Sequence, residues 1–416
     1  MDTLPIAIVG CGGMGRRHLR GLATLQASRF NNVSLAAVCD LHLPNAEDLA
    51  DEAEQLLGSR PRVISRIEDL VAVDGLRGCD ITTDAGSHHR VAVRCLEAGL
   101  HVQIEKPLAL TIRGCDAIVA AARDRGLVLS VAENYRRDPI NRLARALLAD
   151  GAIGTPQFML EVGIGGGRQI AITPWRHHKL TGTIVMDAGI HNADIMLYYL
   201  GDVATAYGEG RIMQPVRYRA QGAGGPGGFY AKWANEFPEQ LEATGEDALF
   251  GSLRFASGAL GTWIAHRGAI GHSQGQRTVY GSNGSLSSPG DRQGAPLTVN
   301  VDGRTITDEA MLDLAPSYRL PPLESSLFGG ERVWRYDGPF NEIDWKIIAQ
   351  EYHEFATCVQ AGTAPEVTGE VGRRTVALVN GLFESGVAGR AVTLDEVESG
   401  AVDAYQREID EHLGLV

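Results

Sequence analysis

The residues that point most directly to chemistry form a glycine-rich turn near the N-terminus. The run Gly10-Cys11-Gly12-Gly13-Met14-Gly15 has G-x-G-x-x-G spacing and lies between a strand-like run and a helical pattern. The first glycine permits a tight turn, the second lets the backbone approach a pyrophosphate, and the third lets the helix pack closely on the strand. The helix N-terminus also attracts phosphate charge. The expected dinucleotide contacts are Gly10, Gly12, Gly13, Met14 and Gly15.

An acidic residue supports this interpretation and selects the cofactor. Asp40 ends the second strand-like run, 25 residues after Gly15, where a carboxylate can bond the adenosine ribose hydroxyls. A carboxylate at this position would repel a 2′-phosphate, and no arginine follows directly in Leu41-His42-Leu43. We therefore expect NAD rather than NADP.

A lysine, two aspartates and a histidine further along the chain are residue types that can transfer protons or stabilise charge in a reaction. Lys106 directly follows the strand-like run 101–105, so it is expected at the carboxyl end of a strand, where open α/β sheets bind ligands. Asp187 and His191 are four residues apart and would project from one face of a helix, with Asp194 three residues further on. A solvent-exposed lysine and a polar helix face are the plainer alternatives for these residues.

The elements that position these residues alternate over the first third of the chain. Strands are expected at residues 6–9, 33–39, 62–65, 80–83, 101–105 and 127–132. Helices are expected at 14–27, at 44–57, from Ser87 as a good N-cap, and from about Thr111. This alternation predicts an α/β fold: residues 1–135 would form a Rossmann domain, a doubly wound parallel sheet with helices on both faces.

Beyond residue 135, strand-like segments dominate. Helices are expected at 139–150, 343–360 and 372–388, and alternating strands at 158–162, 248–255, 259–266 and 277–280. Alternation of apolar and polar residues is typical of a sheet with one covered face. Residues 136–416 should therefore form a substrate-binding α+β domain with a large, open, mostly antiparallel sheet, whose closing helices 343–388 can pack back on the first domain. Residues 221–229 and 287–338 are expected to be long loops.

The composition narrows the class of protein. A hydrophobic content of 44% with 21% charged residues is typical of a soluble globular enzyme, and a net charge of −13 disfavours nucleic acid as a partner. No signal-peptide pattern and no apolar run of about 20 residues occurs, so no membrane partner is expected. The six cysteines lack C-x-x-C spacing, which indicates buried thiols in a reducing cytoplasm and no metal site.

Together these residues resemble the Gfo/Idh/MocA oxidoreductase family. The resemblance is carried by the N-terminal fingerprint, the run from His88 to Lys106-Pro107, Trp175-Arg176, the Asp187-x3-His191-x2-Asp194 block, and a closing helix through Ser385 and Gly389. It implies that Lys106, Asp187 and His191 are catalytic residues beside the nicotinamide and that the Lys106–Pro107 bond is cis. It also implies cofactor contacts from Thr83, His88, Glu105 and Lys106, although the usual Thr-Pro-Asn is replaced by Thr83-Asp84-Ala85.

The residues that the resemblance implies suit the oxidation of a secondary alcohol. Such a reaction needs a base for the hydroxyl proton while hydride leaves the carbon for nicotinamide C4. His191 suits the role of the base because the unperturbed pKa of imidazole lies near neutrality. Lys106 can hydrogen-bond the same oxygen and stabilise developing negative charge, and Asp187 can orient either partner.

A basic cluster before the Asp187–His191 block predicts how the substrate is held. An anion clamp for a carboxylate, sulfonate or phosphate would consist of Arg168, Arg176, His178 and Lys179. A solvated loop, with an arginine packed on Trp175, is the plainer alternative. Tyr135 and Arg136 can face the cleft or pack between domains. Thr183, where the family usually has a glycine triplet, can give a hydroxyl to the substrate pocket.

These observations leave three functions open. The first is an NAD-dependent oxidoreductase that acts on a sugar, polyol or glycoside. The second is a glycosidase that retains NAD and proceeds by transient C3 oxidation, elimination, water addition and re-reduction, with an anionic glycoside as its substrate. The third is a non-catalytic NAD-binding regulator, which the implied set of Lys106, Asp187 and His191 disfavours. The resemblance also implies a homo-oligomer, a dimer or tetramer, formed through the broad sheet of the second domain.

Overall fold

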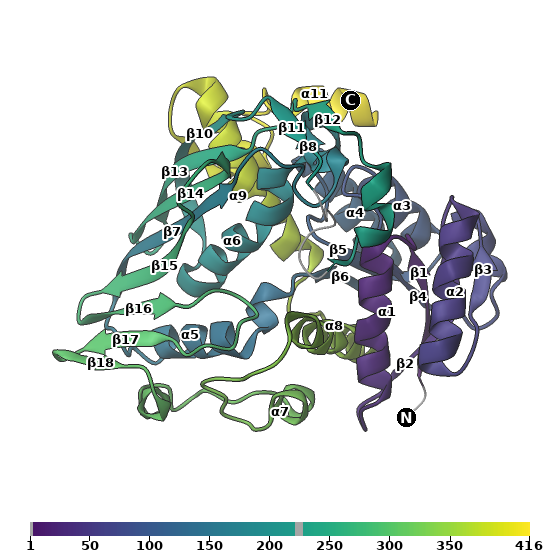
Figure 1. The fold of residues 1–416 in the computed structure, drawn as a ribbon, viewed down its shortest axis with the longest axis horizontal. Helices are drawn as coiled ribbons and strands as arrows, with labels where there is room; N and C mark the ends of the chain where they lie inside the picture. The colour runs from purple at the N-terminus through teal and green to yellow at the C-terminus, as the bar shows by residue number, and fades with distance from the viewer. Residues whose placement is uncertain (1–2, 221–227) are drawn as a thin grey trace.

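The computed structural model of the protein describes residues 3–220 and 228–416. The N-terminal part is a six-stranded parallel sheet in the order β3-β2-β1-β4-β5-β6 (Figure 1). Its strands are β1 (Leu4–Val9), β2 (Val33–Cys39), β3 (Arg62–Ile64), β4 (Gly78–Ile81), β5 (His101–Glu105) and β6 (Leu129–Ala132). The strand order reverses between β1 and β4, where an open sheet leaves a crevice at its carboxyl edge. The prediction of a Rossmann-type parallel sheet is confirmed.

Helices cover both faces of this sheet because successive residues of each strand point to opposite sides. Ile6 and Ile8 pack in clusters with α1 (Gly13–Gln26) and α2 (Leu43–Leu57), whereas Ala7 and Val9 belong to the cluster that holds α3 (His88–Glu97) and α4 (Ile112–Arg125). Short 3-10 segments are η1 (Ile67–Ala72), after β3, and η2 (Tyr135–Arg137), after β6.

The expected helix caps are half right. The Thr111 hydroxyl accepts a hydrogen bond from the backbone nitrogen of Gly114 at 3.2 Å and caps α4. Ser87 occupies the N-cap position of α3, but its hydroxyl donates to Thr83 Oγ1 at 2.9 Å and to the backbone oxygen of Asp84 instead. Ser87 therefore orders the loop after β4 rather than the first turn of α3.

The C-terminal part contains a nine-stranded sheet in the order β18-β17-β16-β15-β7-β14-β13-β10-β19. Its strands are β7 (Pro156–Gly166), β10 (Val203–Arg211), β13 (Ala248–Phe255), β14 (Leu260–Ala269), β15 (Gln274–Gly281), β16 (Gly284–Ser288), β17 (Thr298–Val301), β18 (Arg304–Ile306) and β19 (Val392–Thr393). β7 and β14 run parallel and the other neighbours antiparallel, as the prediction of a mostly antiparallel sheet requires. Buried and exposed residues alternate along β13, which indicates one covered face.

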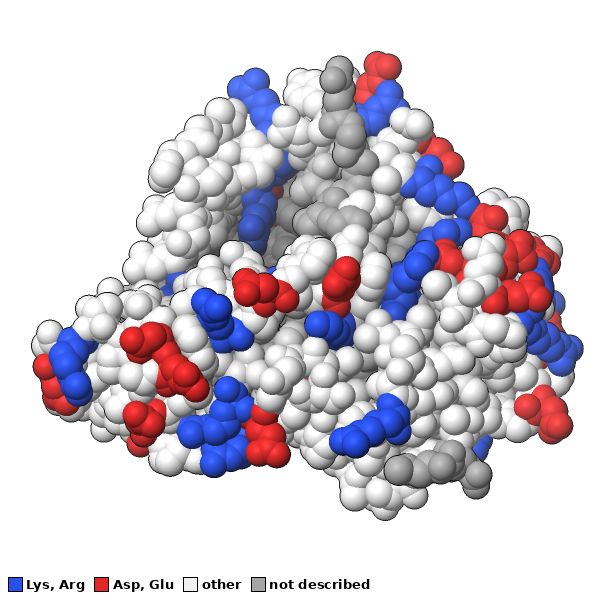
Figure 2. Space-filling model, turned by 60° about the horizontal axis from the view of Figure 1, so that its bottom comes forward, with Lys and Arg blue, Asp and Glu red and all other residues white. Residues whose placement is uncertain are grey.

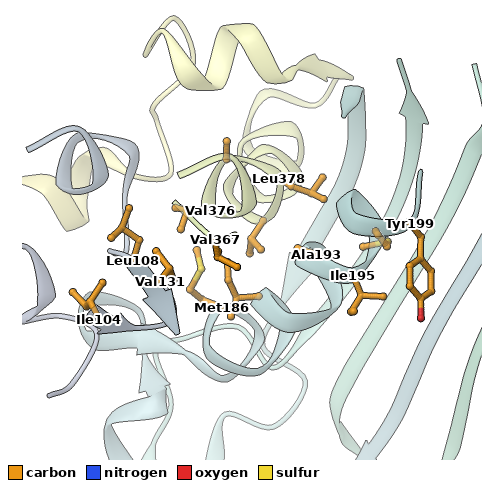
Figure 3. Close-up of a cluster of buried hydrophobic side chains, with 14 of the residues drawn as sticks. Ile104, Leu108, Val131, Met186, Ala193, Ile195, Tyr199, Val367, Val376 and Leu378 are labelled. Carbon is orange, nitrogen blue, oxygen red and sulfur yellow. The ribbon is translucent and has the colours of Figure 1, made fainter. Parts of the chain in front are cut away.

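A layer of helices joins the two sheets (Figure 1). Figure 3 shows its core, in which Met186 of α6 (Ile184–Leu200) and Val376 of α9 (Gly369–Ala388) lie toward Val131 of the parallel sheet, whereas Ile195 of α6 lies on the other side of the layer, beside Tyr199. α5 (Pro139–Ala149) extends this layer, and α8 (Phe340–Ala361) returns to pack along α1. The remaining elements are η3 (Pro174–Arg176), β8 (His177–His178), η4 (Lys179–Thr181), β9 (Gly182–Thr183), β11 (Val216–Tyr218), η6 (Ala231–Glu236), β12 (Gln240–Glu242), α10 (Leu394–Glu398) and α11 (Arg407–Leu413).

The prediction of a long loop over residues 287–338 is wrong. This segment forms β17, β18, η7 (Glu309–Leu314) and α7 (Pro322–Phe328), and it buries Leu297, Val299 and Met311. The two strands have only four and three residues, so the glycines and prolines of the turns that flank them hid the period-two pattern. Most of the glycine-rich run 221–229 lies outside the described residues.

Candidate active site

The glycine turn after β1 has the geometry that a dinucleotide site requires. Gly10 has a φ of +100°, and a Cβ there would lie 2.8 Å from backbone atoms of Thr82 and Thr83. A Cβ at Gly15 would lie 2.3 Å from the backbone oxygen of Gly10, so this glycine is needed for the helix to pack against the turn. A Cβ at Gly12 would meet nothing within 4 Å. The second glycine thus borders open space, as expected where a pyrophosphate approaches the backbone.

Asp40 links the end of β2 to this turn. Its Oδ2 accepts a hydrogen bond from the backbone nitrogen of Cys11 at 2.7 Å, and its Oδ1 accepts one from His42 at 2.8 Å. A carboxylate has about four acceptor positions, so capacity remains for ribose hydroxyls. Asp40, Gly10, Gly12, Gly13, Met14 and Thr83 line one cavity of about 810 Å³. The residues present therefore fit the adenosine and pyrophosphate of NAD.

A second cavity, of about 390 Å³, adjoins the first. Met14, Thr83, Trp175 and Tyr230 line both cavities. The predicted residues His88, Glu105, Lys106, Tyr135, Arg176, Asp187 and His191 line the second cavity. The structure thus brings together residues that lie more than 100 positions apart in the chain.

Lys106 and Asp187 form a buried ion pair in this second cavity. Lys106 Nζ lies 3.2 Å from Asp187 Oδ1 and donates to the backbone oxygen of Asp187 at 3.0 Å. Arg176 Nε donates to Asp187 Oδ2 at 2.7 Å. Burial alone would raise the pKa of Asp187, but Arg176 and Lys106 outweigh it and hold this pKa well below its usual range. Asp187 is therefore a fixed anion that orients two cations.

His191 has a carboxyl partner that the sequence did not suggest. Its Nδ1 lies 2.6 Å from Oε1 of Glu133, and its ring stacks on Tyr135 with 4.1 Å between centroids. Burial and the nearby charge of Lys106 lower the pKa of His191, so the imidazole is neutral near pH 7. Burial raises the pKa of Glu133 to about 7. Because Nδ1 is engaged, Nε2 is the ring nitrogen left for a ligand in the cavity.

A buried chain of polar groups holds the loop that carries Lys106. His18 of α1 lies between two carboxylates, with Nδ1 2.8 Å from Asp80 and Nε2 3.0 Å from Glu105. Glu105 Oε2 in turn accepts from the backbone nitrogen of Lys106 at 3.0 Å, and the peptide bond from Lys106 to Pro107 is cis. Burial alone would lower the pKa of His18, but the two carboxylates raise it to about 10.

His88 supports the same loop from another side. Its Nδ1 lies 2.8 Å from the backbone oxygen of Pro107, and its Nε2 lies 3.2 Å from that of Thr83. The side chain is buried and links the loop after β5 to the loop after β4. Both ring nitrogens of His88 are therefore hydrogen-bonded to backbone oxygens. The residue lines the cavity, and its role is to hold the two loops in place.

The predicted anion clamp is not formed. Of its four residues only Arg176 lines the cavity, and it is bound to Asp187. Arg168 is exposed beyond the end of β7, His178 lies on β8 away from both cavities, and Lys179 pairs with Glu408 at 2.7 Å. The basic residues lie close in sequence but belong to different elements, since Arg176 ends η3, His178 ends β8 and Lys179 begins η4.

The side chains of Arg136 and Thr183 form contacts within the protein that stabilise the fold. Arg136 is buried and forms a bidentate ion pair with Asp194 outside the cavity, so the cleft-facing prediction for it is wrong, whereas Tyr135 does line the cavity. The Thr183 hydroxyl caps α6 by accepting from the backbone nitrogen of Met186 at 2.9 Å. That cap directs the N-terminal turn of α6, which carries Asp187.

Several cavity residues were missed by sequence reasoning. They are Arg17, Arg267, Arg292, Tyr230 and Phe340, and Glu133, which contacts His191 from outside the lining, was missed as well. Glu133 directly follows β6, the last strand of the parallel sheet, so the rule that carboxyl ends of strands carry ligand sites could have found it. The others come from distant strands, helices or loops, and no local pattern marks them.

Comparison with known proteins identifies the family. Residues 4–133 match the model of the oxidoreductase family with an NAD-binding Rossmann fold, and residues 141–287 match that of the GFO/IDH/MocA C-terminal domain. The chain belongs to the Gfo/Idh/MocA family. This membership confirms the resemblance seen in the sequence, and the NAD-binding Rossmann fold confirms the expected cofactor.

Relatives within the Gfo/Idh/MocA family span nearly the whole chain. D-apiose dehydrogenase of Paraburkholderia graminis is 26% identical over 405 residues, which cover 95% of this chain and 91% of the relative. Myo-inositol 2-dehydrogenase of Thermotoga maritima is 23% identical over 394 residues, which cover 94% and 99%. The structure of levoglucosan dehydrogenase in complex with NADH and L-sorbose has the same fold, with a TM-score of 0.73, 21% identity, and coverage of 95% and 100%.

Three further features of the described residues bear on metals, thiols and membranes. Within residues 3–220 and 228–416, no group of three or more His, Cys, Asp or Glu side chains is arranged to hold a metal ion. All six cysteines are buried and free, as expected. None of the helices in the described part of the chain combines the length and the apolar character needed to cross a bilayer.

Proposed function

We propose that this protein is an NAD-dependent dehydrogenase that oxidises a secondary hydroxyl of a sugar or polyol. The observation that carries the proposal is the arrangement of Lys106 and His191, which line one 390 Å³ cavity that adjoins the cavity of the glycine turn. A group bound across both cavities would bring its reactive end between these side chains. The dehydrogenase relatives acting on apiose and inositol support the substrate class.

The cofactor would be held by residues from the carboxyl edge of the parallel sheet. Gly10, Gly12 and Met14 border the space for the pyrophosphate, Asp40 that for the adenosine ribose, and Thr83 the passage between the two cavities. When bound, NAD supplies the carbon that accepts a hydride from the substrate. The chain itself must bind the sugar, orient its hydroxyl and remove the proton.

Lys106 and His191 divide the work on the substrate hydroxyl. His191 is neutral and has Nε2 available, so it accepts the hydroxyl proton as a general base. The Lys106 ammonium has three N–H donors, of which two are directed at Asp187. The third can donate to the substrate oxygen and stabilise negative charge as it develops. Asp187 and Glu133 are positioning residues in this scheme, because they act through Lys106 and His191.

A lysine substitution tests the proposal. Lys106→Met keeps the length of the side chain and removes its donors, so we expect turnover to fall by about 10²- to 10⁴-fold. NADH affinity, measured by fluorescence titration, should change little because the glycine turn is intact. Lys346→Met, on α8 and outside both cavities, is the matched control. Undiminished turnover of a sugar by Lys106→Met would remove the proposed role.

The hydrolytic alternative is left without support. The relatives reported above are dehydrogenases, and no contact of the described residues favours hydrolysis over net oxidation. A nitrophenyl glycoside mixed with the protein and NAD distinguishes the two, since a dehydrogenase forms NADH in proportion to the sugar consumed. Release of nitrophenol without NADH would instead establish a glycosidase.

We also propose that the outer face of the nine-stranded sheet pairs with a second copy of the chain. Apolar side chains are exposed on this face, among them Tyr207 (57% exposed), Phe250 (37%) and Leu260 (46%). Exposed apolar clusters of this kind are typical of protein–protein contacts. Light scattering should give the mass of a dimer or tetramer, and Phe250→Asp should lower it. A monomeric wild type would contradict the proposal.

A further inference from the structure

Arg267 of β14 faces the second cavity from the large sheet. On the neighbouring strand β7, a Cβ placed at Gly163 would lie 3.6 Å from Nη2 of Arg267, so the guanidinium lies close to the backbone of this strand. Gly163 is paired in register with Gly275 of β15, where a Cβ would meet nothing within 4 Å. The guanidinium therefore lies over Gly163, and open space remains beside it on the sheet at Gly275.

The guanidinium of Arg267 has no protein partner in the described residues. Within 3–220 and 228–416 it forms no hydrogen bond and no ion pair, although the side chain is partly buried. Residues 221–227 contain no Asp or Glu that could serve as its counter-ion. The other arginines of the cavity are engaged: Arg176 with Asp187, and both Arg17 and Arg292 with Asp344. A guanidinium that faces a cavity without a protein partner is available to bind an anion.

The charge of the cavity favours the same conclusion. Five Lys and Arg side chains line it, against the carboxylates of Glu105 and Asp187 in the lining and of Asp344 behind it, which pairs with both Arg17 and Arg292. This local excess of positive charge occurs in a chain whose net charge is −13. Figure 2 shows Lys or Arg atoms on one wall of a hollow, with Asp and Glu side chains near its lower rim. A cavity with an excess of positive charge attracts anions.

We propose that Arg267 binds the oxyanion of an acidic sugar, so that the substrate is a sugar acid or a sugar phosphate rather than a neutral polyol. This inference rests on the proposed dehydrogenase function and specifies its substrate class. The planar guanidinium holds a carboxylate or phosphate through two parallel hydrogen bonds, which fixes the direction in which the sugar enters. A fixed entry direction determines which hydroxyl meets Lys106 and His191.

Calorimetric binding to the NADH-loaded protein tests Arg267 without turnover. The ligands form a matched set in which only the group at C6 changes: methyl glucoside, methyl glucuronide and methyl glucoside 6-phosphate, with D-glucitol and D-glucitol 6-phosphate as the open-chain counterparts of the neutral sugar and the phosphate. We expect at least one anion to bind wild type about 10- to 100-fold more tightly than its neutral counterpart, the range of a charge-assisted pair. The preferred member distinguishes a carboxylate from a phosphate.

Two substitutions assign this preference to Arg267. Arg267→Gln should abolish the preference for the anion while leaving the affinity for the neutral ligand and for NADH unchanged, and Arg267→Lys should retain part of it. Arg304→Gln removes an exposed charge on the edge strand β18 and should bind like wild type. Equal binding of anions and neutral sugars by wild type, a preference that survives Arg267→Gln, or a loss of NADH affinity in that variant would each overturn the inference. If the anion binds but yields no NADH with NAD, the dehydrogenase proposal fails while the Arg267 site stands.

Discussion

Replacing Glu133 with glutamine isolates the contribution of one hydrogen bond to the reaction. Oε1 of Glu133 lies 2.6 Å from Nδ1 of His191 and also accepts from the backbone nitrogen of Tyr135 at 3.1 Å. An ionised Glu133 accepts a hydrogen bond from Nδ1–H of His191, which holds the proton on Nδ1 and leaves Nε2 free as the base. The amide of Glu133→Gln has nearly the same shape, but it can either donate or accept, so it no longer selects one tautomer.

The magnitude follows from the strength of that contact. A hydrogen bond to a charged group is worth about 1.5–3 kcal/mol, and about 1.4 kcal/mol corresponds to a tenfold change in rate. We therefore expect kcat of Glu133→Gln to fall by about 10- to 100-fold. KM should change less, because Glu133 acts through His191.

The pH dependence gives the sign of the effect. Burial raises the pKa of Glu133 to about 7, so the carboxyl is protonated below this pH and then donates to Nδ1 rather than accepting from it. The rate of oxidation by wild type should consequently rise with pH through about 7 and then level off. Glu133→Gln should lack this inflection. The assay is initial-rate NADH formation from the best sugar found, measured between about pH 5 and about pH 9.

A matched variant separates this effect from a general loss of a buried carboxyl. Glu324 is buried and burial raises its pKa to about 7 as well, but it pairs with Arg142 outside both cavities. Glu324→Gln should keep the wild-type inflection. The reasoning is refuted if Glu133→Gln retains both the rate and the inflection, or if Glu324→Gln loses the inflection in the same way.

Two further predictions concern the scaffold. Gly12→Ala should leave the melting temperature unchanged, because its Cβ would point into the open space where the pyrophosphate is expected. The same Cβ should weaken NADH binding at least about tenfold. Gly15→Ala should lower the melting temperature, since its Cβ would lie 2.3 Å from the Gly10 oxygen. Because the folded-state pKa of His18 is raised to about 10, its stabilising contribution is complete below about pH 6.5 and is lost as the pH rises through about 10. His18→Gln should therefore lower the melting temperature more at about pH 6 than at about pH 10, and an equal loss at both would contradict this pairing.

Local sequence patterns predicted the parallel sheet and the cofactor site well. The glycine turn, Asp40 and Lys106 follow or end buried strands. The residue type needed at each of these positions is determined by the backbone next to it in sequence, so a local pattern can indicate it. That Asp187 lies near Lys106 and His191 was implied by the family resemblance rather than by spacing, and its ion pair with Lys106 is seen only in the structure. The short strands β17 and β18 were missed because too few residues repeat to reveal a period.

The failures involve side chains whose direction depends on distant contacts. His191 meets Glu133 across 58 residues of sequence, so no local pattern could indicate the pair. Arg136 lies next to Tyr135, which reaches the cavity, yet Arg136 turns to Asp194 because a buried guanidinium requires a partner. Arg267 was not considered because a single arginine in an alternating strand looks like an ordinary surface residue.

The central claim is that Lys106 and His191 act on one sugar hydroxyl while NAD takes the hydride. It is tested most directly by mass spectrometry of the NADH formed from a sugar deuterated at the oxidised carbon. Wild type should produce one deuterated NADH for each oxidised sugar, and Lys106→Met should produce almost none. Deuterium transfer of equal rate in Lys106→Met, or consumption of the sugar without labelled NADH, would contradict the account.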